Sequence, residues 1–491
     1  MARRRIRAWR WVVGISIALA LVLLGLRLWW GSSAGADFDA AVEAIRARGE
    51  PLAWKDFAPK PVADEDNAAD LYRRAANHEA FADQESVDFQ VALLDLVDQP
   101  ARRRTHAEKV ARFLDAAREP LALCRQARER GGVDWKLSHD GPAINTVLPR
   151  LASMMVLAKT LRLAGVADHD AGNDAAALEH FRDALDLARV CRHLPMLIGS
   201  LLASANETAA LKAIEQAAPR LAIGDGRGQA RADDVRRLLA ELLDESEVRE
   251  GLTRAVMGER SMIYDTVQRL RSGETSLGAI QGGGSGPTGV LRSVGTRLFL
   301  RPTFTNDGAF LVKHYTAYVA AARATSYPAA MAKAPTFTPP KSRWWGLRRP
   351  LTAILLASFD QVYKVHYRGV VLRRAAATAL AIRLYQQDHG RRPAKLAGLV
   401  PDYLPAVPVD PFSKTNAPLA YRPKGDPSLL YSVFVNGRDD AGQFALDAAG
   451  KVDRSKSLDW PFFLNGDRPA PKPFDDAAPP STAPTTGPTV P

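Results

Sequence analysis

Cysteine is nearly absent from this sequence of 491 residues, which contains only Cys124 and Cys191. So few cysteines exclude a disulfide framework as the source of stability, and no Cys-x-x-Cys pair is available to hold a zinc ion. Both cysteines fall in segments with helical patterning. In an oxidising compartment they could form one bridge between two helices, or they could be separately buried thiols, and the sequence leaves both open.

Motifs that mark common catalytic sites are also absent. The sequence has no His-Glu-x-x-His, no Gly-x-Ser-x-Gly and no phosphate-binding glycine loop followed by Lys-Ser or Lys-Thr. Asp168, His169 and Asp170 suggest metal or acid–base chemistry, but they fall in a polar turn, where solvated residues are more common. His366 and His389 flank a predicted helix without an evident orienting partner. We therefore favour a protein that is not an enzyme.

A strong charge imbalance is missing outside the N-terminus. The formal net charge is +12, and five of the positive charges precede residue 11. They belong to Arg3, Arg4, Arg5, Arg7 and Arg10. The remaining excess is spread over the rest of the chain and is too weak to indicate nucleic-acid binding.

The composition favours helices. Alanine, leucine and arginine dominate, β-branched runs are scarce in the first two thirds, and 46% of the residues are hydrophobic. We therefore expect a mainly α fold. A chain of this length exceeds what one hydrophobic core usually serves, so we expect two or three domains.

One long apolar run follows the N-terminal arginines. After the basic segment 1–10, residues 11–30 are apolar except for Arg27 and are long enough to cross about 30 Å of hydrocarbon as a helix. Arg27 can extend its side chain to the interface, where Trp29 and Trp30 are also favoured. The run predicts a single-pass transmembrane anchor.

The arginines before the run predict a cytoplasmic N-terminus, because positive charge is retained on the cytoplasmic side. The bulk of the chain would then lie in the periplasm of a bacterium, held at the inner membrane. The competing interpretation is a cleaved signal peptide, because Ala34, Gly35 and Ala36 form a small-residue cleavage site before Asp37.

The segment 37–364 has the spacing of amphipathic helices, and its glycine-rich stretch 278–289 is typical of a flexible loop. Part of it resembles a tetratricopeptide repeat, in which small residues let two helices approach and an aromatic residue fills the groove. The residues that carry this resemblance are Gly165, Gly172, Ala177, Leu178, Phe181, Ala184, Leu185 and Leu187. A weaker second set is Ala210, Leu211, Ile214 and Ala217. The alternative is an ordinary α-hairpin in a bundle.

Residues 341–349 (KSRWWGLRR) mix basic and aromatic side chains before a short apolar run. Such a mixture can rest on an anionic membrane surface, and the alternative is a surface turn that leads into a buried helix.

The segment 365–468 changes pattern. A long helix is expected from His366 to His389, followed by short strands at 419–422, 429–435 and 443–446. One helix laid across a three-stranded antiparallel sheet, an α+β domain, is the expected arrangement. The proline-rich tail 469–491 is expected to be disordered.

This segment resembles the globular domain of the type II secretion major pseudopilins. The matching residues are Leu384, Tyr385, Asp388, Gly390, Pro393, Tyr403, Leu404, Pro408, Asp410, Pro411, Phe412, Tyr421, Tyr431, Ser432, Gly437, Asp439 and Asp440. The resemblance implies a calcium site with Asp439 and Asp440 as ligands. The alternative is that the two adjacent carboxylates are solvated in a turn, in which case we expect no cofactor. The processed pseudopilin start is missing, so we expect a related domain used as an extracytoplasmic module.

Together these features predict a membrane-anchored, non-catalytic interaction or scaffold protein with protein partners, associated with a secretion or envelope assembly. The alternatives are an unrecognised envelope hydrolase and an atypical pseudopilus component.

Overall fold

The chain is described here by a computed structural model covering residues 2–81, 97, 100–143, 146, 148, 150–274, 301–337, 349–356, 359–447, 452–453 and 455–466. The glycine-rich stretch 278–289, residues 341–348 with both tryptophans of the basic stretch, and the tail 469–491 lie outside these residues.

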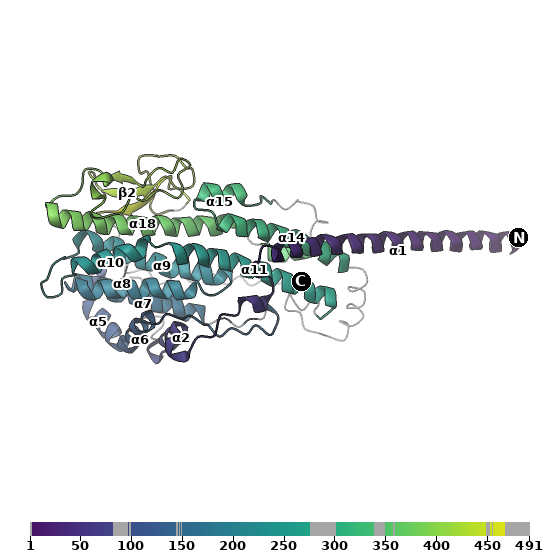
Figure 1. The fold of residues 1–491 in the computed structure, drawn as a ribbon, viewed down its shortest axis with the longest axis horizontal. Coiled ribbons are helices and arrows are strands. Elements are labelled where there is room, and N and C mark those ends of the chain that lie inside the picture. The colour runs from purple at the N-terminus through teal and green to yellow at the C-terminus, as the bar shows by residue number, and fades with distance from the viewer. Residues whose placement is uncertain are drawn as a thin grey trace, which may run out of the picture.

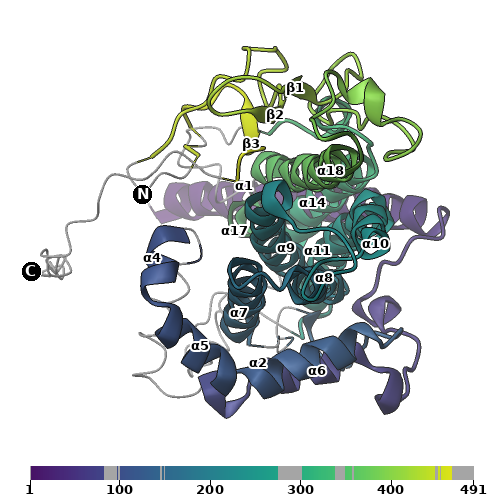
Figure 2. The same cartoon turned by 90° about the vertical axis from the view of Figure 1, so that its left-hand side faces the viewer.

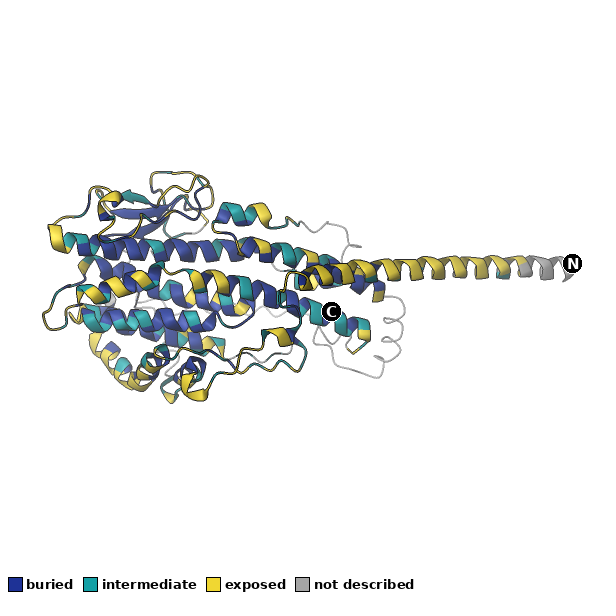
Figure 3. Ribbon diagram, viewed as in Figure 1, coloured by how far each residue is buried: buried dark blue, intermediate teal, exposed yellow. Residues whose placement is uncertain are grey.

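The first helix, α1 (Ala2–Arg46), has two parts with different surroundings. Its apolar part extends away from the rest of the protein, and side chains such as Trp11, Leu21, Leu24 and Trp29 are exposed (Figures 1 and 3). Its last turns are buried on one face through Ala34, Phe38, Ala41, Val42 and Ile45, the spacing of a helix that packs along one stripe. Because the helix is continuous, the extended part and the packed part form one element.

The packed end of α1 lies against α14 (Arg301–Ala322), and α14 lies against α11 (Ser246–Ser272). Gly308 permits the close approach of α14 to α11, because a Cβ there would lie 2.5 Å from a methyl group of Val267. The C-terminal end of α1 is therefore built into the helical core.

The helical core continues through α7 (Leu151–Asp170), α8 (Asp174–Cys191), α9 (Leu197–Ala217) and α10 (Ala232–Leu243). Figure 2 shows a row of smaller helices along the side of the core that lies opposite the β-strands. That row contains α2 (Ala68–Ala76), α4 (Pro100–Thr105), α5 (Ala107–Ala116) and α6 (Arg118–Arg128). Short 3₁₀ turns at Trp54–Phe57, Asp64–Asp66, Glu79–Phe81 and Ala218–Arg220 connect these elements.

The hairpin of α7 and α8 has the close contact that its small residues predict. A Cβ at Gly165 would lie 2.4 Å from the Phe181 ring, so the ring occupies the space that glycine leaves. The second set of repeat-like residues, from Ala210 to Ala217, lies within the single helix α9, which packs against both α7 and α8.

The C-terminal part places one long helix beneath a small sheet. α18 (Phe359–His389) begins before the predicted His366, so the expected domain boundary at residues 364 and 365 falls inside it. Helix α18 packs against α9 and α10 as well as against the sheet, and Figure 1 shows it between them. The shorter elements nearby are α15 (Tyr327–Lys333), α17 (Pro350–Leu355) and the 3₁₀ turn Leu396–Leu399.

The sheet is antiparallel with the order β1 (Ala420–Arg422), β2 (Leu429–Ser432) and β3 (Trp460–Phe463). The predicted third strand at 443–446 is wrong, since Leu446 forms only an isolated bridge with Val452. The segment 460–463 takes its place because it can bury three large aromatic side chains beside β2. Its Pro461 is tolerated because β3 is an edge strand, where one face of the backbone needs no partner.

Candidate functional site

A buried ion-pair cluster lies where α1 ends. Glu50 accepts hydrogen bonds from Arg260 of α11 at 2.7 Å and from Arg323, just past the end of α14, at 2.8 Å. Burial raises the pKa of the Glu50 carboxyl, but the two arginines outweigh that effect and the net pKa is lowered. The chain that leaves α1 is thereby fixed to both α11 and the segment after α14.

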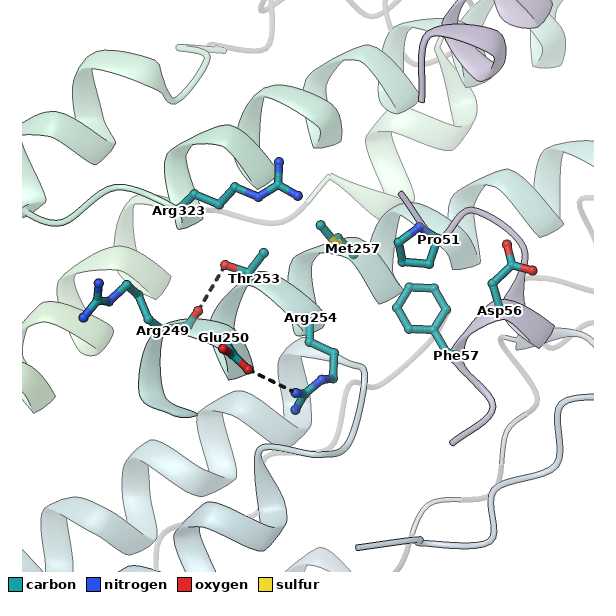
Figure 4. A pocket seen from close by; sticks show the side chains of 9 residues that line it. All are labelled: Pro51, Asp56, Phe57, Arg249, Glu250, Thr253, Arg254, Met257 and Arg323. Carbon is teal, nitrogen blue, oxygen red and sulfur yellow. Dashed lines mark hydrogen bonds and ion pairs between the residues drawn. The ribbon is translucent and has the colours of Figure 1, made fainter. Parts of the chain in front are cut away.

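A hollow of about 530 Å³ opens directly beside this cluster. Its apolar side chains, Pro51, Phe57 and Met257, gather on one side, as Figure 4 shows. Thr253 and Arg249 lie toward the other side, and Arg249 points away from the apolar group. The remaining lining residues are Asp56, Glu250, Arg254 and Arg323. The hollow thus has an apolar end and a polar end.

The charges around the hollow are unequally neutralised. Asp56 accepts hydrogen bonds from the backbone N–H groups of Leu52 and Ala53, so its carboxylate is held within its own turn. Arg254 lies 4.0 Å from Glu250. The Arg249 guanidinium, by contrast, makes no hydrogen bond or ion pair with any residue that the structure describes. Arg249 is therefore the positive charge available to a ligand.

Arg249 also lines a second, smaller hollow of about 180 Å³. His366 of α18 faces it and is only 8% exposed, yet its ring has no hydrogen-bond partner in the described part of the chain. The pKa of His366 is lowered to about 4, mainly by burial and to a smaller extent by the positive charge of Arg192. The ring is therefore neutral at physiological pH. The hydroxyl of Tyr367 beside it donates to the Ala324 carbonyl at 2.8 Å.

A buried triad of charged side chains lies close to His366. Glu207 of α9 accepts hydrogen bonds from both Arg192, just past the end of α8, and Arg373 of α18, and all three side chains are buried. Arg373 also donates to the carbonyls of Leu242 and Asp244 at the C-terminal end of α10. Sequence analysis missed these residues, although charged side chains within the apolar faces of predicted helices were the available signal.

The triplet that suggested chemistry holds structural contacts. His169 Nδ1 lies 2.5 Å from Asp174, and Asp170 pairs with Arg103 at 2.8 Å. Asp168 lies 3.4 Å from His180. The three residues therefore tie α7 to different neighbours and do not converge on a common point.

The predicted calcium ligands lie in a loop beside the sheet. Asp439 accepts hydrogen bonds from the Tyr431 hydroxyl and the Ala441 N–H, and Asp440 accepts one from Asn436. Asp459, which is fully buried, accepts the N–H groups of residues 440 and 442 through Oδ2, while its Oδ1 has no partner. Within the described ranges, no group of three or more His, Cys, Asp or Glu side chains is arranged so that it could hold a metal ion.

The two cysteines are separate. Cys124 on α6 and Cys191 on α8 are both buried and free, so the two-thiol interpretation is confirmed. Burial raises the pKa of the Cys191 thiol to about 12 and that of the Cys124 thiol well above its usual value. Neither thiol is an activated nucleophile.

Comparison with known proteins adds no relative. No protein-family model, no curated protein and no solved structure matches this chain. The likenesses to tetratricopeptide repeats and to pseudopilin heads therefore rest on the residues named above, and the account of function rests on the geometry of α1 and of the hollows on α11.

Proposed function

We propose that this protein is held in a bacterial inner membrane by α1 and that its body acts outside the cytoplasm as a non-catalytic interaction or scaffold protein. Among the described residues, α1 is the one helix long and apolar enough to cross a membrane. The five arginines before the span favour a cytoplasmic N-terminus.

The observation that carries the proposal is the continuity of α1. Apolar side chains such as Leu21 and Leu24 are exposed, and hydrocarbon is the environment that stabilises them. A few turns later Phe38 is fully buried in the protein core. A helix that is solvated by lipid at one end and buried in protein at the other holds the body close to the membrane surface.

This continuity also supports an uncleaved anchor. The possible cleavage site at residues 34–36 lies within the helix, and Ala34 is buried. Ala36 and Asp37, on either side of the bond that would be cut, are exposed, but a protease binds its substrate in an extended conformation and the helix would have to unwind there first. The ion pairs of Asp168, His169 and Asp170 support a structural function for the triplet that most resembled a catalytic group.

Protease digestion of intact spheroplasts tests the orientation. We expect added protease to degrade the body before lysis, and protection until lysis would contradict the proposal. The intact mass of the membrane-extracted protein tests the anchor separately. We expect a mass that includes residues 1–36, whereas a chain beginning at Asp37 would show that α1 is a signal peptide.

A further inference from the structure

The two hollows along the first turns of α11 are adjoining parts of one region. They share Arg249, and Arg323 lines the larger hollow while the next two residues, Ala324 and Thr325, line the smaller one. Their volumes of about 530 Å³ and 180 Å³ suit a small molecule, because most small-ligand sites enclose roughly 300–1,000 Å³.

Two independent features indicate what this region can bind. Arg249 offers a guanidinium that no described residue neutralises, and a guanidinium is well suited to a planar carboxylate. His366 lines the smaller hollow, and its ring nitrogens, which form no hydrogen bond with a residue that the structure describes, are not sealed off from that hollow. A ligand oxygen that reached both side chains would supply the two missing partners.

The opposite end has a different chemistry. Met257 is 8% exposed, and Pro51 and Phe57 lie on the same side of the hollow, with the Asp56 carboxylate at the edge of this apolar group (Figure 4). An apolar group that covers this surface lowers the free energy of the complex, roughly in proportion to the apolar area removed from water. The polar and apolar ends together define an amphipathic ligand.

We infer that the hollows on α11 bind a small amphipathic carboxylate. Its apolar body packs on Met257, Phe57 and Pro51, and its carboxylate meets Arg249 and His366. The site is independent of which side of the membrane the body occupies, so it can be present or absent whatever the outcome of the topology experiments.

Isothermal titration calorimetry on the full chain in lipid nanodiscs tests the inference, with empty nanodiscs as the blank. The probe is 4-phenylbutyrate, compared with 4-phenylbutan-1-ol and 4-phenylbutylamine, which have the same apolar body. We expect saturable binding of the acid and at least about tenfold weaker binding of the alcohol and the amine, since one charge-assisted hydrogen bond contributes about that factor. Absence of acid binding, or equal affinity for all three probes, would overturn the inference.

Variants locate the site. Arg249 is exposed, so Arg249→Gln should leave the melting temperature unchanged and weaken acid binding at least about tenfold. Arg236→Gln on α10 removes an exposed arginine elsewhere and should leave the affinity unchanged. His366→Phe should weaken binding of the acid but not of the alcohol. Undiminished binding by Arg249→Gln would show that the acid binds somewhere else.

Discussion

Glu50 and Arg260 form a buried ion pair in which Oε2 of the carboxylate lies 2.7 Å from Nη1 of the guanidinium. The Glu50 side chain is 6% exposed and that of Arg260 is not exposed at all. Glu50 follows the last turn of α1, and Arg260 lies in the middle of α11. The pair therefore connects the membrane helix to the core at the edge of the larger hollow.

Removing the carboxylate should be costly, because it leaves a buried guanidinium without its counter-charge. We expect Glu50→Ala to lower the free energy of unfolding by about 3 kcal/mol or more, measured by chemical denaturation. Glu43→Ala is the control. Its partner Arg46 lies 3.9 Å away and both side chains are exposed, so a loss of less than about 1 kcal/mol is expected. Similar losses in the two variants would contradict a structural function for the Glu50 pair.

The buried His366 should make stability depend on pH. Its pKa is lowered from 6.5 to about 4 in the folded protein, so between these values the unfolded chain binds a proton that the folded chain does not. Stability should therefore rise as the pH increases from about 4 to 6.5, with a contribution on the order of 3 kcal/mol. Unfolding free energies measured across this range should rise less steeply in His366→Asn, and an unchanged slope would count against the buried neutral ring.

The contact of Gly165 with Phe181 predicts a size-dependent defect. Gly165→Ala should destabilise the protein by about 1–3 kcal/mol, because the new methyl group collides with the ring. Phe181→Leu introduced into that variant should recover part of the loss, since the smaller side chain leaves room. The control Gly35→Ala lies in a helix with nothing within 4 Å and should be neutral or mildly stabilising. Equal effects at the two glycines in thermal unfolding would show that α7 and α8 are not this closely packed.

The pseudopilin likeness predicts calcium binding by Asp439 and Asp440. Burial, together with the charges of these two residues, raises the pKa of Asp459 to about 6, so a nearby cation would relieve the repulsion. Calcium bound there should produce binding heat and a higher melting temperature, and Asp440→Asn should diminish both. A flat titration with no change in melting temperature would remove calcium from the account.

The sequence was sufficient for the main helical elements and for the apolar N-terminal helix, because these follow from local periodicity and from the length of one apolar run. It also located β1 and the start of β2. It failed at β3, since strand pairing between residues 429–432 and 460–463 spans a long intervening loop and the strand contains Pro461. Local pattern carries no information on which distant segment completes a sheet.

The candidate site was harder to predict for the same reason. Phe57, Met257 and Arg323 come from three separate segments and meet only through the packing of α11 against its neighbours. His366 was noticed as a residue near a helix end, but its surroundings include Val248 and Arg249 of α11 and residues 324 and 325 after α14, which line the same hollow. Only the charged residues within apolar helical faces, such as Glu207, carried a signal that the sequence alone could reveal.

The most direct test of the central claim is the labelling of one engineered thiol from outside the membrane. Asp233 on α10 is 86% exposed, and the native Cys124 and Cys191 are buried with raised pKa values, so Asp233→Cys should supply the reactive thiol. If α1 holds the body outside the cytoplasm, a membrane-impermeant maleimide will label intact spheroplasts as fully as lysed ones. Labelling that occurs only after lysis would contradict the account.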